Sequence, residues 1–210
     1  TDAIFRLASM TKAITSTAIM MLVEEGRIGL DTPVSAYLPA LASPQVFTRY
    51  NAEDGTFTAK AADKEITVRQ LLTHTSGLGY TFTSDILNKL MSGNFWTSSA
   101  TAYPLLFEPG SNWQYGESTR VLGEIVTAVS GQELFEFMQA RLLQPLHMQD
   151  TSYDIAADKN ARVVTVHRSN GSESLEEANP PGAITSAHNG DGGLSGTARD
   201  YAQLIRLFLN

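Results

Sequence analysis

The feature that most constrains this chain is a serine and a lysine three residues apart, Ser9 and Lys12, at the start of a helical pattern. Residues i and i+3 share a helix face, with Cβ atoms roughly 5–6 Å apart. A serine hydroxyl becomes a good nucleophile when a nearby amine takes its proton. The helix macrodipole and partial burial both disfavour the charged form of that amine. The same spacing also fits a helix start with a solvated lysine, so other segments must decide.

Hydrophobic patterns place this pair between a strand and a long helix. Residues 2–7 predict the end of a strand, and the helix that follows extends to about Glu25. Gly26 suits the end of that helix. Its apolar stripe consists of Ile14, Ala18, Met21 and Leu22.

Further along, helical patterns alternate with short extended segments. Asp54-Gly55 lies between two strand-like runs, 46–50 and 56–60, which predicts a β-hairpin. A strand is expected over 162–166, followed by a polar turn over 170–177. Helices are expected over 67–76, 84–92, 97–106, 118–129 and 132–143, and from about 198 onward. The chain is therefore predicted to be rich in helix, with little sheet of its own.

Charge and composition argue against several kinds of partner. The 210 residues carry a net charge of −7 and no basic cluster, which disfavours nucleic acid and anionic membranes. No apolar run approaches the roughly 20 residues of a membrane span, and no signal-peptide pattern is present. With no cysteine and four widely separated histidines, we expect no metal.

Longer motifs decide how the serine–lysine pair is interpreted. The most specific is the run Leu71-Leu-Thr-His-Thr-Ser-Gly-Leu78. The others are residues 4–12, the hairpin with Asp54-Gly55, Glu108-Pro-Gly110 with Tyr115, 121–125, 145–151 and 192–201. Together they resemble the serine β-lactamase-like superfamily, and within it the family VIII carboxylesterases related to class C β-lactamases. The resemblance covers nearly the whole chain.

This resemblance implies an α+β fold of the serine β-lactamase/D-Ala carboxypeptidase type, an α/β domain with an all-helical subdomain. The family's first motif, S-x-x-K, matches Ser9 and Lys12, and its second begins at Tyr115. The third motif, K-T-G in lactamases and often W-x-G or H-x-G in esterases, is absent from these residues. The N-terminal hairpin and C-terminal strands of the family's sheet are also absent, so we expect a piece of a longer polypeptide.

The same resemblance suggests a division into domains. Residues 1–26 would form the nucleophile strand and helix of the α/β domain. Residues 27–160 would form a mainly helical domain with a hairpin insertion at 46–60. Residues 161–210 would return to the α/β domain and stop before the third motif.

The resemblance also assigns roles. Ser9 would attack the substrate carbonyl, Lys12 and Tyr115 would move protons, and the Ser9 N–H would supply half of an oxyanion hole. The absent third-motif strand would supply the other half. Glu117 replaces the Asn of lactamases. We hypothesise that its carboxylate repels the anionic carboxylate of a β-lactam and tolerates a neutral ester.

Other residues have two possible roles each. Tyr115 is either a proton carrier or a buried aromatic residue with a satisfied hydroxyl. Ser118 is either a substrate contact or a helix N-cap. His74 is expected to hydrogen-bond its own loop rather than act as a catalytic base. Residues predicted to line the substrate site or to pack closely beside it are Trp113, Gly192 and Gly193.

The predicted function is therefore a serine hydrolase of the carboxylesterase type. It would cleave short-acyl esters, its small-molecule partners, through an acyl-enzyme and without metal or organic cofactor. Alternatives in the same superfamily are a β-lactamase or D-Ala carboxypeptidase, and an acyltransferase that uses an alcohol in place of water. An alternative of another class is a catalytically inactive domain that binds peptidoglycan or a partner protein.

Overall fold

The computed structural model describes residues 2–92, 104–169, 171, 174–179 and 188–209 and divides the chain into two compact units. Unit 1 comprises Thr1–Ile14 and Glu133–Asn210, and unit 2 comprises Thr15–Gln132. The first boundary falls within helix α1 (Thr11–Glu24), which ends as the sequence predicts, just before Gly26. The domain boundaries predicted after residues 26 and 160 remain a prediction.

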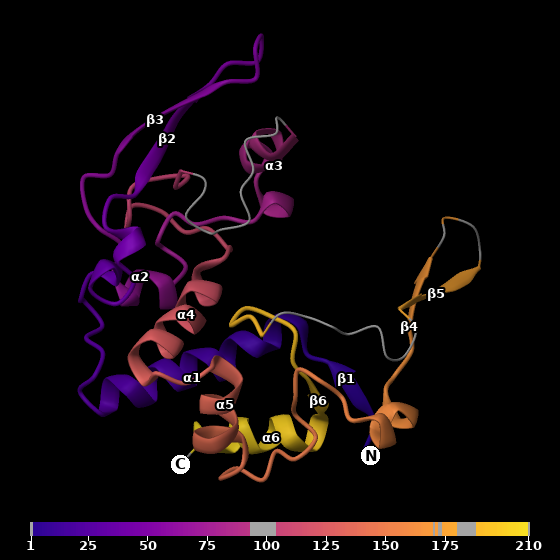
Figure 1. Cartoon of the computed structure of the whole chain (residues 1–210). Coiled ribbons are helices and arrows are strands. Elements are labelled where there is room, and N and C mark those ends of the chain that lie inside the picture. Colours follow the sequence, from indigo (N-terminus) through magenta and orange to yellow (C-terminus); the bar gives the residue numbers. More distant parts are fainter. Residues whose placement is uncertain (1, 93–103, 170, 172–173, 180–187, 210) are drawn as a thin grey trace. The chain divides into compact units, whose positions relative to one another are not determined.

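Unit 1 is organised around two short strands from opposite ends of the sequence. Strand β1 (Ile4–Arg6) pairs antiparallel with β6 (Ser195–Thr197). Helix α6 (Ala198–Leu207) follows β6 directly, and the Thr197 hydroxyl caps it by accepting the Asp200 N–H at 3.1 Å. Figure 1 shows β1, β6 and the start of α6 together. The strand predicted over 2–7 and the helix predicted from about 198 are confirmed.

A second helical segment supplies much of the core of unit 1. Helix α5 (Leu134–Met138) continues into one π-helical turn, Gln139–Leu143, so the helix predicted over 132–143 is confirmed. Its buried face consists of Leu134, Phe137, Met138, Leu142 and Leu143. Apolar side chains at this spacing share one helix face, which explains why this segment is helical.

The remaining strands of unit 1 correct two predictions. Residues 157–162 form a 3₁₀ helix, and strand β4 (Val166–Ser169) begins where the predicted strand 162–166 was expected to end. Strand β5 (Leu175–Asn179) pairs antiparallel with β4, so the polar turn predicted over 170–177 was wrong at its C-terminal end. The sequence of β5 carries no apolar alternation. Pairing with β4 stabilises it instead, and such pairing is invisible in a local pattern.

Unit 2 contains the predicted hairpin. Strands β2 (Gln45–Tyr50) and β3 (Phe57–Ala61) pair antiparallel (Figure 1). Gly55 has a φ of 73°, a left-handed conformation that suits glycine in this turn. Asp54 accepts the Thr56 N–H at 2.9 Å and the Thr56 hydroxyl at 2.7 Å, which fixes the turn.

Helices form the rest of unit 2. Helix α3 (Asp85–Ser92) confirms the prediction over 84–92, and α4 (Ser118–Ser130) confirms that over 118–129. Residues 97–103 of the predicted helix 97–106 lie outside the described residues, and Leu105 forms a β-bridge with Val46.

Helix α2 (Val68–Leu72) packs against α4 and is shorter than predicted. A capping box between Thr67 and Gln70 starts it. The prediction extended it to about residue 76, but His74 has a φ of 56°, which a helix cannot contain. The His74 carbonyl instead accepts the Gln114 N–H at 2.9 Å.

Candidate active site

Ser9 lies in a 3₁₀ turn, Ala8–Met10, between β1 and α1. The turn is held from both sides, because the Leu7 N–H donates to the Leu194 carbonyl at 2.8 Å and the Met10 N–H to the Leu7 carbonyl at 2.9 Å. Ala8 has a φ of 45°, which residues with a Cβ rarely adopt. A strained backbone next to an exposed serine is typical of functional sites, where the surrounding structure holds it in place.

The structure brings Lys12 to Ser9. The Lys12 Nζ lies 3.3 Å from the Ser9 Oγ and donates a hydrogen bond of 2.7 Å to the Asp191 carbonyl. Its side chain is half-buried, whereas Ser9 is exposed. The lysine is therefore aimed at the serine by a backbone oxygen from a distant segment. Sequence reasoning missed Asp191, because a carbonyl contact leaves no signature in residue type.

A glycine-containing loop connects Asp191 to β6 and lies against the Ser9 turn. A Cβ at Gly192 would lie 3.9 Å from the Ala8 carbonyl oxygen, and Gly193 has a φ of 102°. The Leu194 N–H then donates to the Thr11 hydroxyl at 3.3 Å. Gly193 is required by its left-handed conformation, since L side chains disfavour it. Both predicted glycines therefore lie beside the Ser9 turn.

Tyr115 belongs to unit 2, in a cluster of aromatic rings. Its ring centroid lies 5.0 Å from that of His74 and 5.6 Å from that of Tyr80. Its backbone carbonyl accepts the Thr83 hydroxyl at 3.1 Å. These contacts fix the backbone and the ring plane of a half-buried tyrosine.

The next residue, Gly116, holds Tyr115 close to the end of the 71–78 run. A Cβ at Gly116 would overlap the Leu78 carbonyl oxygen and lie 2.5 Å from the Gly79 Cα. Only a glycine permits this approach of two backbones. The backbone that follows Tyr115 is therefore packed directly against the backbone at Leu78 and Gly79.

The side chain of Glu117 is occupied by an ion pair. The Arg120 Nη2 lies 2.9 Å from the Glu117 carboxylate, and the Arg120 Nη1 lies 2.7 Å from the Glu124 carboxylate. Burial raises the pKa of Glu124, Arg120 lowers it, and the charge of Glu117 raises it further. The sequence singled out Glu117 but missed Arg120, although the i, i+3 and i+4 spacing of the three residues was a usable signal.

The other two predicted substrate contacts differ in accessibility. Ser118 is fully buried, and its Oγ lies 2.8 Å from the Ser76 Oγ. The N-cap of α4 is Glu117, which makes no side-chain capping bond, so the N-cap role expected for Ser118 was wrong by one residue. Trp113 is 60% exposed, with its ring 6.2 Å from His74. Trp113 is accessible to a ligand, whereas the Ser118 hydroxyl faces another side chain.

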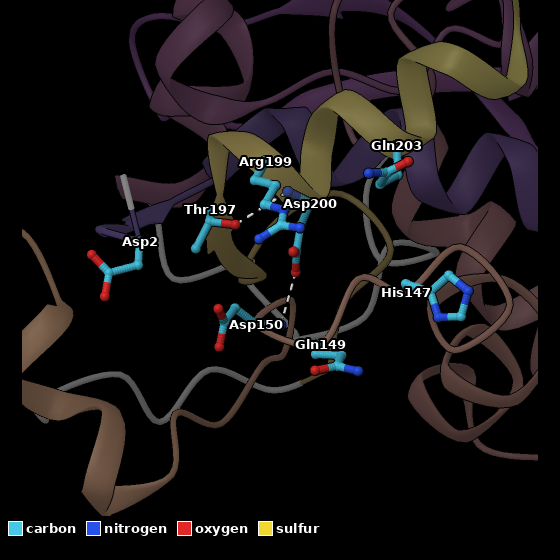
Figure 2. Close-up of a pocket in the computed structure, with 8 residues that line it drawn as sticks. All are labelled: Asp2, His147, Gln149, Asp150, Thr197, Arg199, Asp200 and Gln203. Atoms are coloured by element: carbon cyan, nitrogen blue, oxygen red, sulfur yellow. Dashed lines mark hydrogen bonds between the residues drawn. The ribbon is translucent and has the colours of Figure 1, made fainter.

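Unit 1 also contains a polar pocket of about 430 Å³ beside the start of α6. Figure 2 shows Asp200 linked by hydrogen bonds to Thr197 and to the backbone of Asp150. Hydrogen bonding to Arg162 lowers the pKa of Asp150 to about 2. The pocket is lined by Asp2, His147, Gln149, Asp150, Thr197, Arg199, Asp200 and Gln203. The carboxylates of Asp150 and Asp200 are used in structural contacts.

Over the part of the chain that the structure describes, no group of three or more histidine and acidic side chains could hold a metal ion. None of the helices described is long and apolar enough to cross a membrane.

Comparison with known proteins places these features in context. The family model named Beta-lactamase matches residues 1–210. Lovastatin esterase of Penicillium rubens is 34% identical over 202 residues, which is 91% of this chain and 48% of that protein. Acyltransferase calJ of Penicillium decumbens is 34% identical over 176 residues, which is 78% of this chain and 42% of that protein.

A solved structure is similar over almost the entire chain. Unliganded simvastatin synthase (LovD) from Aspergillus terreus gives a TM-score of 0.89 at 27% identity, covering 99% of this chain and 54% of that one. The chain thus spans about half the length of the proteins it matches.

Proposed function

The chain belongs to the β-lactamase family, and from that premise we propose that it carries the nucleophile of a carboxylesterase that cleaves short-acyl esters through an acyl-enzyme. The predicted mixed helix-and-strand fold of the serine β-lactamase and D-Ala carboxypeptidase type is confirmed by the structural match. Named relatives in this family include an esterase and an acyltransferase.

One observation carries the proposal: the Lys12 Nζ lies 3.3 Å from the Oγ of an exposed Ser9. A general base must lie within hydrogen-bond reach of the proton that it removes, and apo distances slightly longer than the ideal are normal. The backbone carbonyl of Asp191, 2.7 Å from the same nitrogen, holds the amine in this direction. The geometry supports a serine activated by lysine.

The chemistry follows from these groups. The Ser9 Oγ attacks the ester carbonyl while its proton passes to the Lys12 amine. The tetrahedral intermediate collapses to an acyl-Ser9 ester, and the leaving alcohol takes up a proton relayed by Lys12 and Tyr115. Water then attacks the acyl-enzyme, releases the acid and returns the proton to Ser9. Tyr115 enters this scheme through its match to the family's second motif.

Acyl transfer to an alcohol is the second candidate. The acyl-Ser9 intermediate is the same, and only the acceptor in the second step changes. An acyltransferase among the relatives supports this candidate. The two candidates differ in whether the acceptor site favours water or an organic hydroxyl.

The test uses the intact protein with a p-nitrophenyl ester of a short acid, with and without a small alcohol. We expect p-nitrophenol release that disappears in Ser9→Ala, and Ser9 labelling by a fluorophosphonate probe. Free acid as the main product supports the esterase, and the alkyl ester supports the transferase. Substantial turnover by Ser9→Ala would refute the assignment. No labelling of the wild type would favour the inactive binding domain.

A further inference from the structure

We infer that Tyr153 is a positioning residue for Lys12: its hydroxyl holds the 188–194 segment so that the Asp191 carbonyl directs the lysine at Ser9. The inference deepens the proposed function and rests on it, because it concerns the base of that same site. All the residues involved belong to unit 1.

Two hydrogen bonds connect Tyr153 to Lys12 through the short segment from Asn189 to Asp191. The Tyr153 hydroxyl donates to the Asn189 carbonyl at 2.5 Å. Two residues later, the Asp191 carbonyl accepts from the Lys12 Nζ at 2.7 Å. One side-chain hydroxyl therefore anchors the segment whose carbonyl contacts the lysine.

Tyr153 itself is rigidly held. Its side chain is fully buried, the Phe135 ring meets it edge-on at 5.4 Å, and the His188 ring stacks on it at 4.6 Å. A fully buried side chain of this size has few available rotamers, so its hydroxyl is a fixed point rather than a loose contact. The stack with His188 adds a second attachment, at the start of the same segment.

The surroundings of Tyr153 keep its hydroxyl protonated, so that it can donate a hydrogen bond. Burial raises the pKa of Tyr153, and the nearby Asp191 carboxylate raises it further. Titratable groups that face this assembly include Lys12, His188 and Asp154, the last lying 3.4 Å from the His188 Nε2. The hydroxyl therefore keeps its proton across the working pH range of an enzyme and donates it to Asn189.

The far end of the segment has its own anchor. The Leu194 N–H and carbonyl bind the Ser9 turn through Thr11 and Leu7. Between the anchors at Asn189 and Leu194, Gly192 and Gly193 give the backbone more freedom than other residues would. We therefore expect loss of the Tyr153 hydroxyl to shift the Asp191 carbonyl.

The test compares Tyr153→Phe with Phe135→Leu in the intact protein. The first variant removes only the hydroxyl, and the second disturbs the packing of the same ring without touching that hydroxyl. We expect Tyr153→Phe to lower kcat and the fluorophosphonate labelling rate of Ser9 by about tenfold or more, with KM little changed, since small misplacements of a catalytic group are costly. Phe135→Leu should lower the melting temperature but keep the labelling rate within about twofold.

Two more variants make the result decisive. In a Lys12→Ala background, adding Tyr153→Phe should slow labelling no further, because the effect passes through the lysine. His188→Ala, which removes an exposed ring, should slow labelling a few-fold even if Tyr153→Phe fails to fold. Three results would each overturn the inference. They are wild-type labelling rates in the variants that fold, slowing by Phe135→Leu equal to that by Tyr153→Phe, and additive slowing when Tyr153→Phe is added to Lys12→Ala. Activity retained by Ser9→Ala would instead refute the proposed function.

Discussion

Arg120 donates hydrogen bonds from two nitrogens to one carboxylate oxygen of Glu117, from Nε at 3.2 Å and from Nη2 at 2.9 Å. Both side chains are about four-fifths buried, at 20% and 18% exposure. A charge-assisted pair of this kind neutralises most of the field that a lone carboxylate would project. The hypothesis that Glu117 repels anionic substrates therefore depends on Arg120.

We expect Arg120→Gln to strengthen that repulsion. For substrates bound near Glu117, kcat/KM for an ester with a carboxylate should fall by about five- to tenfold, the effect of about 1 kcal/mol of added charge repulsion. A neutral ester of the same size should be affected much less. Steady-state kinetics on the matched pair of esters measure this, and Glu124→Gln, which keeps the Glu117–Arg120 pair, is the control. Equal losses on both esters would show that Arg120 is only structural.

The original hypothesis has its own test in the unmodified protein. A short p-nitrophenyl ester should be hydrolysed faster than a chromogenic cephalosporin, because the cephalosporin carries a carboxylate. Faster turnover of the cephalosporin would refute the hypothesis and favour the lactamase alternative. Glu117→Gln should narrow the difference between the two substrates if the carboxylate causes it.

The buried contact between Ser118 and Ser76 predicts a stabilising role for this pair. Ser118→Ala removes one of the hydrogen bonds of the Ser76 hydroxyl, which still accepts the Leu78 N–H, and should cost about 1 kcal/mol of unfolding free energy, with KM unchanged. Urea denaturation and steady-state kinetics measure the two quantities. A raised KM at unchanged stability would instead support Ser118 as a substrate contact.

Gly116→Ala should be far more damaging than an ordinary glycine substitution. Its Cβ would meet backbone atoms of Leu78 and Gly79, which cannot rotate away. We expect a loss of several kcal/mol or failure to fold, seen by thermal unfolding. Gly131→Ala is the matched control: it has a φ of 74° but open space around its Cβ, so only backbone strain of roughly 1–2 kcal/mol applies.

Asp150 predicts an acid-dependent loss of stability. Hydrogen bonding to Arg162, followed by Lys159, holds its pKa at about 2 in the fold, below the ordinary 3.8. Because the folded carboxyl binds a proton less readily, its stabilising contribution is complete above about pH 4 and is lost as the pH falls toward 2. Urea unfolding across this range should show a shallower pH dependence for Asp150→Asn. A pH dependence in Asp150→Asn as steep as that of the wild type would contradict this role of Asp150.

Sequence patterns were most informative where local periodicity and capping decide the structure. The helices over 118–129, 132–143 and from 198, and the hairpin around Asp54-Gly55, all have their signals within a few residues. The i, i+3 spacing also predicted that Ser9 and Lys12 lie together. These features need no information from distant parts of the chain.

Features set by distant contacts were missed. Ser9 lies in a 3₁₀ turn rather than in the α-helix, because Leu194 binds the backbone beside it. Helix α2 stops early because the His74 carbonyl bonds to Gln114. The Asp191 carbonyl accepts from Lys12, 179 residues away, and the Tyr153 hydroxyl donates to the Asn189 carbonyl, 36 residues away. No local pattern encodes either contact.

The pairing of β1 with β6 has a consequence for biosynthesis. Thr11, in the first turn of α1, bonds to Leu194 across 183 positions of sequence. A ribosome makes Ser9 before the strand that supports its turn, and the residues between Thr11 and Leu194 must all be synthesised in between. Contacts of such long range form slowly. We therefore expect β1 to stay unpaired in the nascent chain until the segment around Leu194 has been synthesised, and the Ser9 turn to form only then.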